Sequence, residues 1–453
     1  MSSPLGNSAP CTCTLLLFAL ATSGCSSVFG VEAPRVRTHR ITGAGPLVQM
    51  LRVELQRSAP VRVEYWTDDG RRLLVDSSTA ATHSILVSRL RPDRTYFYRI
   101  VGTNAEGAFT TEALPPDLAR LRLTATGTPT TPLVLLHLFD PHGFRGYAAV
   151  NAEGEIVWYW RTVDMALGAV RRANGRSVFM DRGRGLLDVR PDGSVVHELP
   201  QDEIREQHHD VIETRNGTLL FLAFDGRQHA GTLLKGEAIW EWWPETGRTA
   251  KRWSSWDHLS PLRDRAPLPG VEWLHANSLA IGPRGNVLVS FRLLNQVMSI
   301  SPDFARVEWR LGGVNATRPL AASDQYSGQH TARELAADRL LLFDNGVIRR
   351  DSSRALELDL SASAVKAVWQ WRPARRNFSA FVGSARRLAN GNTVITFGMS
   401  AFAGSTGPIE VYEVNRKGET VWHLEAAETR QTFRAEPWPS IGSEYEKGEP
   451  QTN

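Results

Sequence analysis

Histidine and arginine side chains recur at corresponding places in a repeated strand pattern. His209, His275 and His330 each stand at the start of an apolar strand that leads into a turn and a second apolar strand. Arg292 stands where the second strand of the His275 unit ends. A turn between antiparallel strands brings the start of the first strand and the end of the second to one edge of a sheet. These positions therefore predict that the four side chains gather at a common edge.

Imidazole and guanidinium groups in this combination favour chemistry on an anion. Their N–H donors can hold a compact oxyanion while one neutral imidazole attacks it. Imidazoles are also common zinc and copper ligands. A fixed arginine repels a dication, however, and only the nearby Asp210 would offset it. A single histidine at such a position is usually a structural group. Three histidines at equivalent positions of successive units indicate a functional site. We expect an oxyanion site that needs no metal, with metal binding as the alternative.

The stretch 271–313 shows the unit that positions these groups. It contains four short apolar strands separated by turns, the first turn formed by Pro283 to Asn286. The expected strands are Ala276–Ile281, Val287–Phe291, Gln296–Ile300 and Val307–Leu311. Such a unit is a four-stranded antiparallel meander.

Similar units recur from about residue 133 to residue 425, with a period of about 40 residues. Turns such as Asn174–Gly175, Asn216–Gly217 and Asn390–Gly391 each precede an apolar run. Later in each unit, the outer strand carries tryptophan, which we expect to pack between neighbouring units rather than against a ligand. About six units are counted, with the first or last shared between the two ends of the chain. The pattern predicts an all-β fold with a six-bladed β-propeller over residues 130–435, followed by a polar C-terminal tail at 436–453.

A smaller β domain is expected to precede the propeller, over residues 35–114. Its Leu90-x-Pro92-x-x-x-Tyr96 spelling resembles the tyrosine corner of a fibronectin type III sandwich, with Tyr96 as the corner residue. A linker is expected from Leu114 to about Thr131. The sandwich resemblance concerns the fold and carries no information on activity.

The charge and the distribution of basic residues indicate whether the protein binds nucleic acid. The net charge is +4 over 453 residues, and lysine occurs only at positions 235, 251, 366, 417 and 447. No run of basic residues follows the pattern that binds a phosphate backbone, so we expect no nucleic-acid partner. The sequence does not indicate an oligomeric state.

The N-terminal residues predict export. A short apolar run at 15–21 is followed by Thr22–Ser23–Gly24–Cys25, which resembles the bacterial lipobox. We therefore expect a lipoprotein-type signal peptide at 1–25, lipidation of Cys25, and a periplasmic, cell-envelope or extracellular location. Membrane contact is expected only through that anchor. Plain secretion and a non-targeting N-terminus are the alternatives.

The ordered motifs of the repeat resemble those of bacterial arylsulfate sulfotransferases, which are exported six-bladed propellers that do not use 3′-phosphoadenylyl sulfate. The resemblance covers about residues 130–425. The motifs that carry it are His208–His209–Asp210, Leu274–His275–Ala276–Asn277–Ser278, Ser290–Phe291–Arg292, Leu311–Gly312–Gly313, Gln329–His330 and Phe343–Asp344–Asn345–Gly346.

The resemblance implies a role for each matched residue. His330 is implied as the nucleophile that carries the sulfuryl group, with His275, Asn277, Arg292 and His209 as further catalytic residues. Strand alternation should allow only one of His208 and His209 to face inward, and we favour His209. Substrate-binding roles are expected for His208, Asn345 and Phe291.

The expected reaction moves a sulfuryl group between phenols, from an aryl sulfate donor to a phenolic acceptor, by a ping-pong mechanism without a cofactor. Candidate residues of an aromatic funnel are Phe224, Phe291, Trp273 and Phe402, although each fits a core position better. Two alternatives stay open. The propeller could be a non-catalytic binding or scaffold protein, or a sulfatase-like hydrolase that uses the same histidines with water.

Overall fold

A computed structural model describes residues 34–204, 206–229, 231–264, 271–349, 352–361, 364–398, 408–426 and 431–442. Regular structure in these residues is almost entirely β-strand, with one four-residue α-helix, α1 (Pro116–Ala119), and two 3-10 helices, η1 (Ser255–Asp257) and η2 (Ala322–Asp324). No helix among them has the length and apolar character needed to cross a membrane. The predicted signal peptide, Cys25 and Phe402 lie outside the described residues, as does most of the predicted tail.

The N-terminal strands form one five-stranded antiparallel sheet. Strand β2 pairs with β1 and β3 along its first half and with β3 and β4 along its second half. The sequence predicted a sandwich, but hydrogen bonds here join all five strands because β2 and β3 are long enough to serve both halves. The predicted corner residue, Tyr96, is buried, and its Oη accepts a hydrogen bond from the Arg91 N–H at 2.9 Å. The strands are β1 (Val36–Gly45), β2 (Val48–Thr67), β3 (Gly70–Val87), β4 (Thr95–Ile100) and β5 (Glu106–Thr110).

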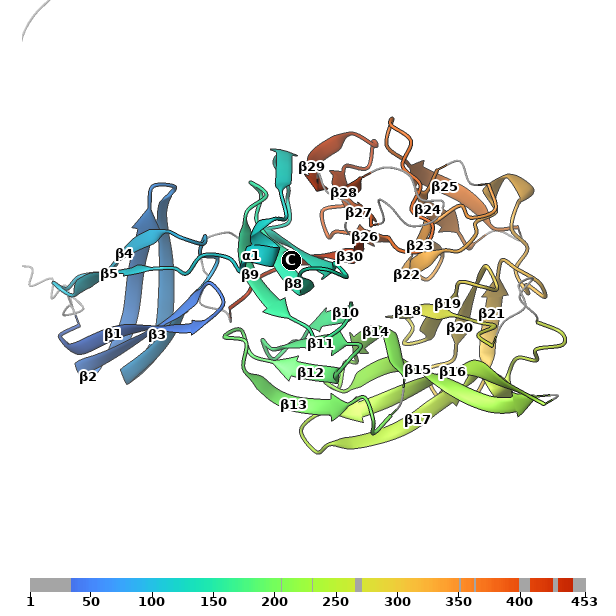
Figure 1. The fold of residues 1–453 in the computed structure, drawn as a ribbon, viewed down its shortest axis with the longest axis horizontal. Coiled ribbons are helices and arrows are strands. Elements are labelled where there is room, and N and C mark those ends of the chain that lie inside the picture. The colour runs from blue at the N-terminus through green and yellow to red at the C-terminus, as the bar shows by residue number, and fades with distance from the viewer. Residues whose placement is uncertain are drawn as a thin grey trace, which may run out of the picture. The chain divides into compact units, whose positions relative to one another are not determined.

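The rest of the described chain forms six antiparallel sheets that follow one another in sequence, and Figure 1 shows them arranged around a centre. Four of them are simple meanders of consecutive strands. These are β10 (Ala166–Arg171), β11 (Ser177–Asp181), β12 (Gly185–Val189) and β13 (Val195–Pro200); β14 (Gln207–Glu213), β15 (Leu219–His229), β16 (Thr232–Trp243) and β17 (Arg248–Ser254); β18 (Ala276–Ile281), β19 (Val287–Phe291), β20 (Gln296–Ile300) and β21 (Val307–Leu311); and β22 (His330–Ala336), β23 (Arg339–Asp344), β24 (Arg354–Asp359) and β25 (Lys366–Trp371).

The other two sheets combine strands from distant parts of the chain. In one, the C-terminal strand β30 pairs with β7, so this sheet contains strands from both ends of the chain's repeat region, as the repeat count predicted. In the other, β6 pairs with β29. The strands are β30 (Gln431–Trp438), β7 (Leu133–Phe139), β8 (Arg145–Val150) and β9 (Ile156–Arg161); and β26 (Ser384–Arg387), β27 (Thr393–Phe397), β28 (Ile409–Val414), β29 (Thr420–Ala426) and β6 (Leu123–Gly127).

These pairings correct two predicted boundaries. The segment predicted to be a linker contains α1 and β6, because β6 completes the edge of the last sheet. The predicted start of the tail at residue 436 falls inside β30, where Trp438 is buried and packs in the same apolar cluster as Ile441. In two sheets of this propeller-like fold, strands from the beginning and the end of the repeat region therefore pair with each other.

Tryptophans of the outer strands join neighbouring sheets, as the sequence predicted. The indole N–H of Trp158 donates to Pro191 O, that of Trp371 to Gly418 O, and that of Trp422 to Ala152 O. Each acceptor lies in the turn that follows the third strand of the adjacent meander. Burial of the large ring together with this bond ties one sheet to the next.

Candidate active site

The three predicted histidines lie where the innermost strands of consecutive sheets begin. His209 is the third residue of β14, His275 immediately precedes β18, and His330 is the first residue of β22. The register of each strand shifts beside its histidine. His209 and His275 have positive φ angles of 59° and 55°, and Thr331, which follows His330, has 51°. Such strained backbone is typical of functional sites.

These side chains come together around the ring of Phe433 on β30. The His209 ring lies 4.6 Å from the His275 ring and 5.7 Å from Phe433, measured between centroids. The His330 ring lies 6.4 Å from the same phenylalanine. The prediction that these histidines gather at one site therefore agrees with the geometry.

His330 is held in one tautomer. Its Nδ1 lies 2.8 Å from Asn345 Oδ1 and 3.1 Å from Gly328 O. The Gly328 carbonyl can only accept, so Nδ1 carries the hydrogen and Nε2 carries the lone pair. Nε2 is buried and has no hydrogen-bond partner among the described residues. The structure therefore presents an uncommitted imidazole nitrogen with nucleophilic character.

Asn345 fixes the orientation of the His330 ring through its contact with Nδ1. Its Nδ2 donates to Ser379 O at 2.6 Å and to Val382 O at 2.9 Å, which leaves Oδ1 facing His330. Both amide hydrogens are used and the residue is fully buried. The sequence assigned Asn345 to substrate binding, but these bonds make it a positioning residue for His330.

His330 is also kept uncharged. Burial is the largest cause that lowers its pKa from 6.5 to about 3; the bond to Asn345 opposes the shift, and Arg292, His275 and Arg434 contribute to it. Burial is therefore a larger cause of the lowered pKa than the neighbouring arginine. The neutral, nucleophilic form is therefore present throughout the physiological range.

Arg292 supplies a cation without a carboxylate partner among the described residues. Its Nη2 donates to Ala380 O at 3.4 Å, its guanidinium lies 4.7 Å from the Phe381 ring, and its Nε is buried without a partner. Burial lowers the pKa of Arg292, and Glu272 partly offsets the effect. Because arginine remains charged at any physiological pH, this side chain is suited to hold an anion.

Asn277 links two neighbouring inner strands. Its Nδ2 donates to Gln329 O at 2.8 Å, and Gln329 in turn donates through Nε2 to Ser290 Oγ and to Phe291 O. These bonds fix the backbone directly before His330. Asn277 Oδ1 is buried and unpartnered among the described residues, so the side chain also keeps one unused acceptor.

Arg434 on β30 is a residue of this site that the sequence analysis missed. Its Nη1 lies 3.0 Å from Asp210 Oδ1, and its Nη2 donates to the carbonyls of His209 and Asn277. Asp210, the acid considered for a metal site, is thus bound by an arginine. The available signal was the Phe433–Arg434 pair at the start of a strand, in phase with the other inner strands.

His208 and His209 both reach the site, contrary to the expectation from strand alternation. The bulge at His208–Val211 breaks the alternation, and the two Nδ1 atoms lie 2.8 Å apart. His208 stacks on Phe224, with ring centroids 4.1 Å apart, and its Nε2 lies 3.0 Å from Glu237 Oε2. His209 is the one that contacts His275 and Phe433, which agrees with the preference stated from the sequence.

His275 also faces a carboxylate that the sequence analysis did not identify. Its Nδ1 lies 2.7 Å from Glu272 Oε1. Burial tends to raise the pKa of Glu272, but His275, His208 and Lys235 lower it below its ordinary value overall. The ionised carboxylate lies at ion-pair distance from Nδ1 of His275, so it favours a hydrogen on that nitrogen.

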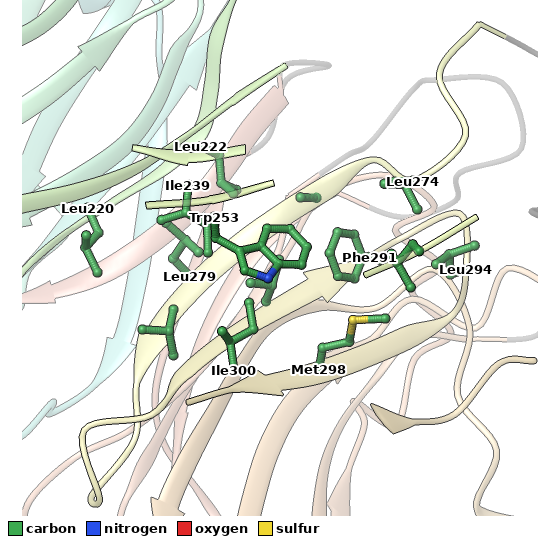
Figure 2. Close-up of a cluster of buried hydrophobic side chains, with 14 of the residues drawn as sticks. Leu220, Leu222, Ile239, Trp253, Leu274, Leu279, Phe291, Leu294, Met298 and Ile300 are labelled. Carbon is green, nitrogen blue, oxygen red and sulfur yellow. The ribbon is translucent and has the colours of Figure 1, made fainter. Parts of the chain in front are cut away.

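Phe291 does not line the site. It is fully buried in an apolar cluster with Trp253, Leu274 and Met298, as Figure 2 shows. The predicted substrate-binding role is therefore wrong for this residue, because its side chain points to the space between sheets. Trp273 belongs to the same cluster. Phe224 is partly exposed beside His208, as a funnel residue would be.

A sequence model of the arylsulfotransferase (ASST) family matches residues 125–434. The chain belongs to the arylsulfotransferase family. The matched region starts in β6 and ends at Arg434, so it includes strands of all six sheets and the histidines His209, His275 and His330. No curated protein sequence matches this chain.

Solved structures similar to this chain are distant. A protein of unknown function from Bacteroides caccae is 15% identical, with a TM-score of 0.46, over 67% of this chain and 98% of that one. A catalytically inactive virginiamycin B lyase from Staphylococcus aureus with quinupristin is 11% identical, with a TM-score of 0.35, over 68% and 99%. A luciferin-regenerating enzyme is 9% identical, with a TM-score of 0.41, over 69% and 99%. The activities of these proteins are not transferred to this chain.

Proposed function

We propose that this chain transfers a sulfuryl group from an aryl sulfate to a phenol by a ping-pong mechanism, through a sulfohistidine on His330. The observation that carries the proposal is the buried lone pair of His330 Nε2, oriented by Asn345 and close enough to Arg292 for its charge to act on the ring. Family membership supports sulfotransferase chemistry in general.

In the first half-reaction, His330 Nε2 attacks the sulfur of the aryl sulfate. An N–S bond forms, the bond from sulfur to the aryl oxygen breaks, and its electron pair leaves on the phenolate, which takes up a proton. In the second half, the acceptor phenol loses its proton and its oxygen attacks the same sulfur. The N–S electron pair then returns to Nε2. Arg292 and His275 hold the sulfonyl oxygens during both steps.

The surrounding aromatic side chains suit an aryl substrate. Phe433 lies against His209 and His330, Phe224 stacks on His208, and Phe381 lies beside Arg292. These rings offer apolar surface next to the charged groups, as a site for an aromatic anion requires. We propose that donor and acceptor phenols occupy this surface in turn.

Two experiments test the proposal together. Intact-protein mass spectrometry after brief mixing with 4-nitrophenyl sulfate should show the mass of one added SO₃ group, and the adduct should disappear when phenol is added. Release of 4-nitrophenol should depend on the acceptor phenol. Release without an acceptor would indicate a sulfatase, and saturable binding without any release would indicate a binding protein.

The architecture that carries this site is proposed as a six-bladed propeller behind a fibronectin type III-like domain. Six consecutive antiparallel sheets and the pairing of β30 with β7 support the propeller. The bond from Arg91 N–H to Tyr96 Oη supports the relation of the N-terminal domain to that fold. A crystal structure that shows six sheets around one axis would test the blade count.

Export as a lipoprotein is proposed from the sequence alone, on the apolar run and the Ser23–Gly24–Cys25 motif. The multiple acyl chains of a lipoprotein hold a protein firmly to a membrane. Cys25→Ser should therefore move the protein from the membrane fraction to the soluble fraction or block its processing. A wild-type protein that is already wholly soluble would contradict the proposal.

A further inference from the structure

A buried line of ionisable groups leads away from His209. His208 Nδ1 lies 2.8 Å from His209 Nδ1, and His208 Nε2 lies 3.0 Å from Glu237 Oε2. Glu237 is fully buried on β16, and His208 is 6% exposed. The role proposed above for His330 uses neither Glu237 nor His208, so their contacts require a separate explanation.

The contacts determine where the hydrogens lie. The Ala276 N–H donates to Glu237 Oε1 at 2.8 Å, which leaves Oε2 to face His208. That 3.0 Å separation is an ion-pair contact, and neither atom has a well-aligned hydrogen bond among the described residues. The negative charge of Glu237 favours a hydrogen rather than a lone pair on the facing Nε2 of His208. In neutral His208 the Nδ1 atom is then an acceptor, and His209 must present Nδ1–H to it. His209 Nε2 is left with a lone pair, and no described residue hydrogen-bonds to that atom.

We propose that Glu237, His208 and His209 form a proton relay that takes the proton of the acceptor phenol and returns it to the leaving phenolate. This inference rests on the proposed function, because it assigns the proton steps of that reaction. His209 is the catalytic residue of the relay. His208 and Glu237 act through it.

The transfer balances atom by atom. The acceptor phenol gives its proton to His209 Nε2, and the phenol oxygen keeps the O–H electron pair. The hydrogen on His209 Nδ1 passes to His208 Nδ1, so the positive charge moves to His208 and faces the Glu237 carboxylate. In the first half-reaction of the next turnover, the same two hydrogens move back and Nε2 delivers a proton to the leaving oxygen. A relay that starts neutral takes its first proton from solvent water.

The surroundings explain why the charge should leave His209. Burial and the neighbouring His275, His208, His330 and Arg434 lower the pKa of His209 well below its ordinary value. A carboxylate stands next to His208 but not next to His209. Charged or titratable groups around the pair are Glu237 and Lys235 on β16, Asp210 on β14, Glu272 and His275 before β18, Arg292 after β19, His330 on β22 and Arg434 on β30.

Glu237→Gln tests the relay with two readouts. The Ala276 N–H should hold the Gln oxygen in place, which turns the amide N–H₂ toward His208 Nε2. The hydrogens of both rings should then reverse, giving His208 Nδ1–H and His209 Nε2–H, and histidine side-chain ¹⁵N NMR at neutral pH detects that exchange. This arm needs no turnover, so it decides the relay even if the wild type transfers nothing to any phenol, which would overturn only the proposed function.

The second readout is the dependence of each half-reaction on phenol acidity. Adduct formation from 4-nitrophenyl sulfate, whose leaving group needs little protonation, should stay within a few-fold of wild type. Transfer to unsubstituted phenol, and adduct formation from phenyl sulfate, should fall by about 10²-fold. His208→Gln should give the same pattern if Glu237→Gln folds poorly.

Glu413→Gln is the matched control, because Glu413 is also a fully buried carboxylate but binds Thr130 and Asn392 in another sheet. It should change neither the ring hydrogens nor the acidity dependence. An unchanged tautomer pattern in Glu237→Gln, or an equal loss of rate with acidic and weakly acidic phenols, would overturn the relay.

Discussion

Two buried histidines in different regions of this molecule have opposite hydrogen-bond states. In the N-terminal sheet, His83 Nδ1 lies 2.8 Å from Asp76 Oδ2, and its Nε2 lies 2.9 Å from Ala59 O and 3.0 Å from Ala80 O. In the candidate active site, His330 has described partners only at Nδ1. Both rings are about 1% exposed, so burial does not separate them.

The difference extends beyond these two residues. Among the described residues of the N-terminal sheet and its loops, Arg91 Nε is the one buried side-chain polar atom without a hydrogen-bond partner. The candidate active site and its surroundings have several, namely His137 Nε2, His208 Nε2, Glu237 Oε2, Glu272 Oε1, Asn277 Oδ1, Arg292 Nε, Gln329 Oε1, His330 Nε2 and Arg434 Nε. An unpaired buried polar group costs roughly 1–3 kcal/mol. A concentration of such groups in one place indicates that a ligand completes them, whereas the satisfied network of His83 indicates a structural role.

The largest expected effect is from His330→Asn. Loss of the nucleophile should reduce turnover by at least about 10³-fold and should abolish the SO₃ adduct. His83→Asn is the matched control, since it removes a ring of equal burial from the other region. That variant should be less stable to urea but should form the adduct at the wild-type rate once folded. Normal adduct formation in a folded His330→Asn protein would break the comparison.

A smaller loss is expected from Arg292→Ala. Removing one charge-assisted donor from an oxyanion site typically lowers the rate by about 10²-fold. Arg292→Lys keeps the charge but lacks the planar fork of donors, so it should be impaired as well. Steady-state kinetics with 4-nitrophenyl sulfate and phenol would measure both variants. Full activity of Arg292→Ala would remove this residue from the mechanism.

Asn345→Asp should change the pH dependence more than the maximal rate. A carboxylate beside His330 Nδ1 favours the protonated ring, which raises the pKa of His330. In the wild type that pKa is lowered to about 3, so the ring should not limit adduct formation above that pH. In the variant the acid limb should move upward toward neutrality. Identical pH profiles of the two proteins would show that Asn345 does not control the charge of His330.

The convergence of the site residues could be predicted from the sequence because it depends on repetition. Turns at similar spacing place His209, His275 and His330 at the starts of equivalent strands, and Arg292 at the end of the following strand. Strand phase alone is enough to bring such positions to one end of a set of sheets. The family motifs contain the same residues, so both arguments identify the same site.

The residues that were missed depend on contacts between distant segments and on local irregularity. Arg434 and Phe433 reach the site because β30 pairs with β7, which is far away in sequence. Glu237 lies on a third strand and Glu272 in a connection, where no repeat marks them. Phe291 was assigned to the substrate because it directly precedes Arg292, but it lies on the regular strand β19 with its ring in the apolar cluster between sheets.

The smallest predicted effect concerns stability in acid. Burial lowers the pKa of both His330 and His137 to about 3, while the unfolded chain takes up a proton near 6.5. Stability from each residue is therefore complete above pH 6.5 and is lost as the pH falls from 6.5 toward 3. Each histidine should lower the free energy of unfolding by about 2 kcal/mol between pH 6.5 and 5, at roughly 1.4 kcal/mol per pH unit. Urea unfolding of His330→Asn and His137→Asn at pH 7.5 and 5 should show a smaller difference between the two pH values than the wild type. The exposed His142→Asn variant should match the wild type, and an unchanged difference in the two buried-histidine variants would mean that these rings are charged in the folded protein.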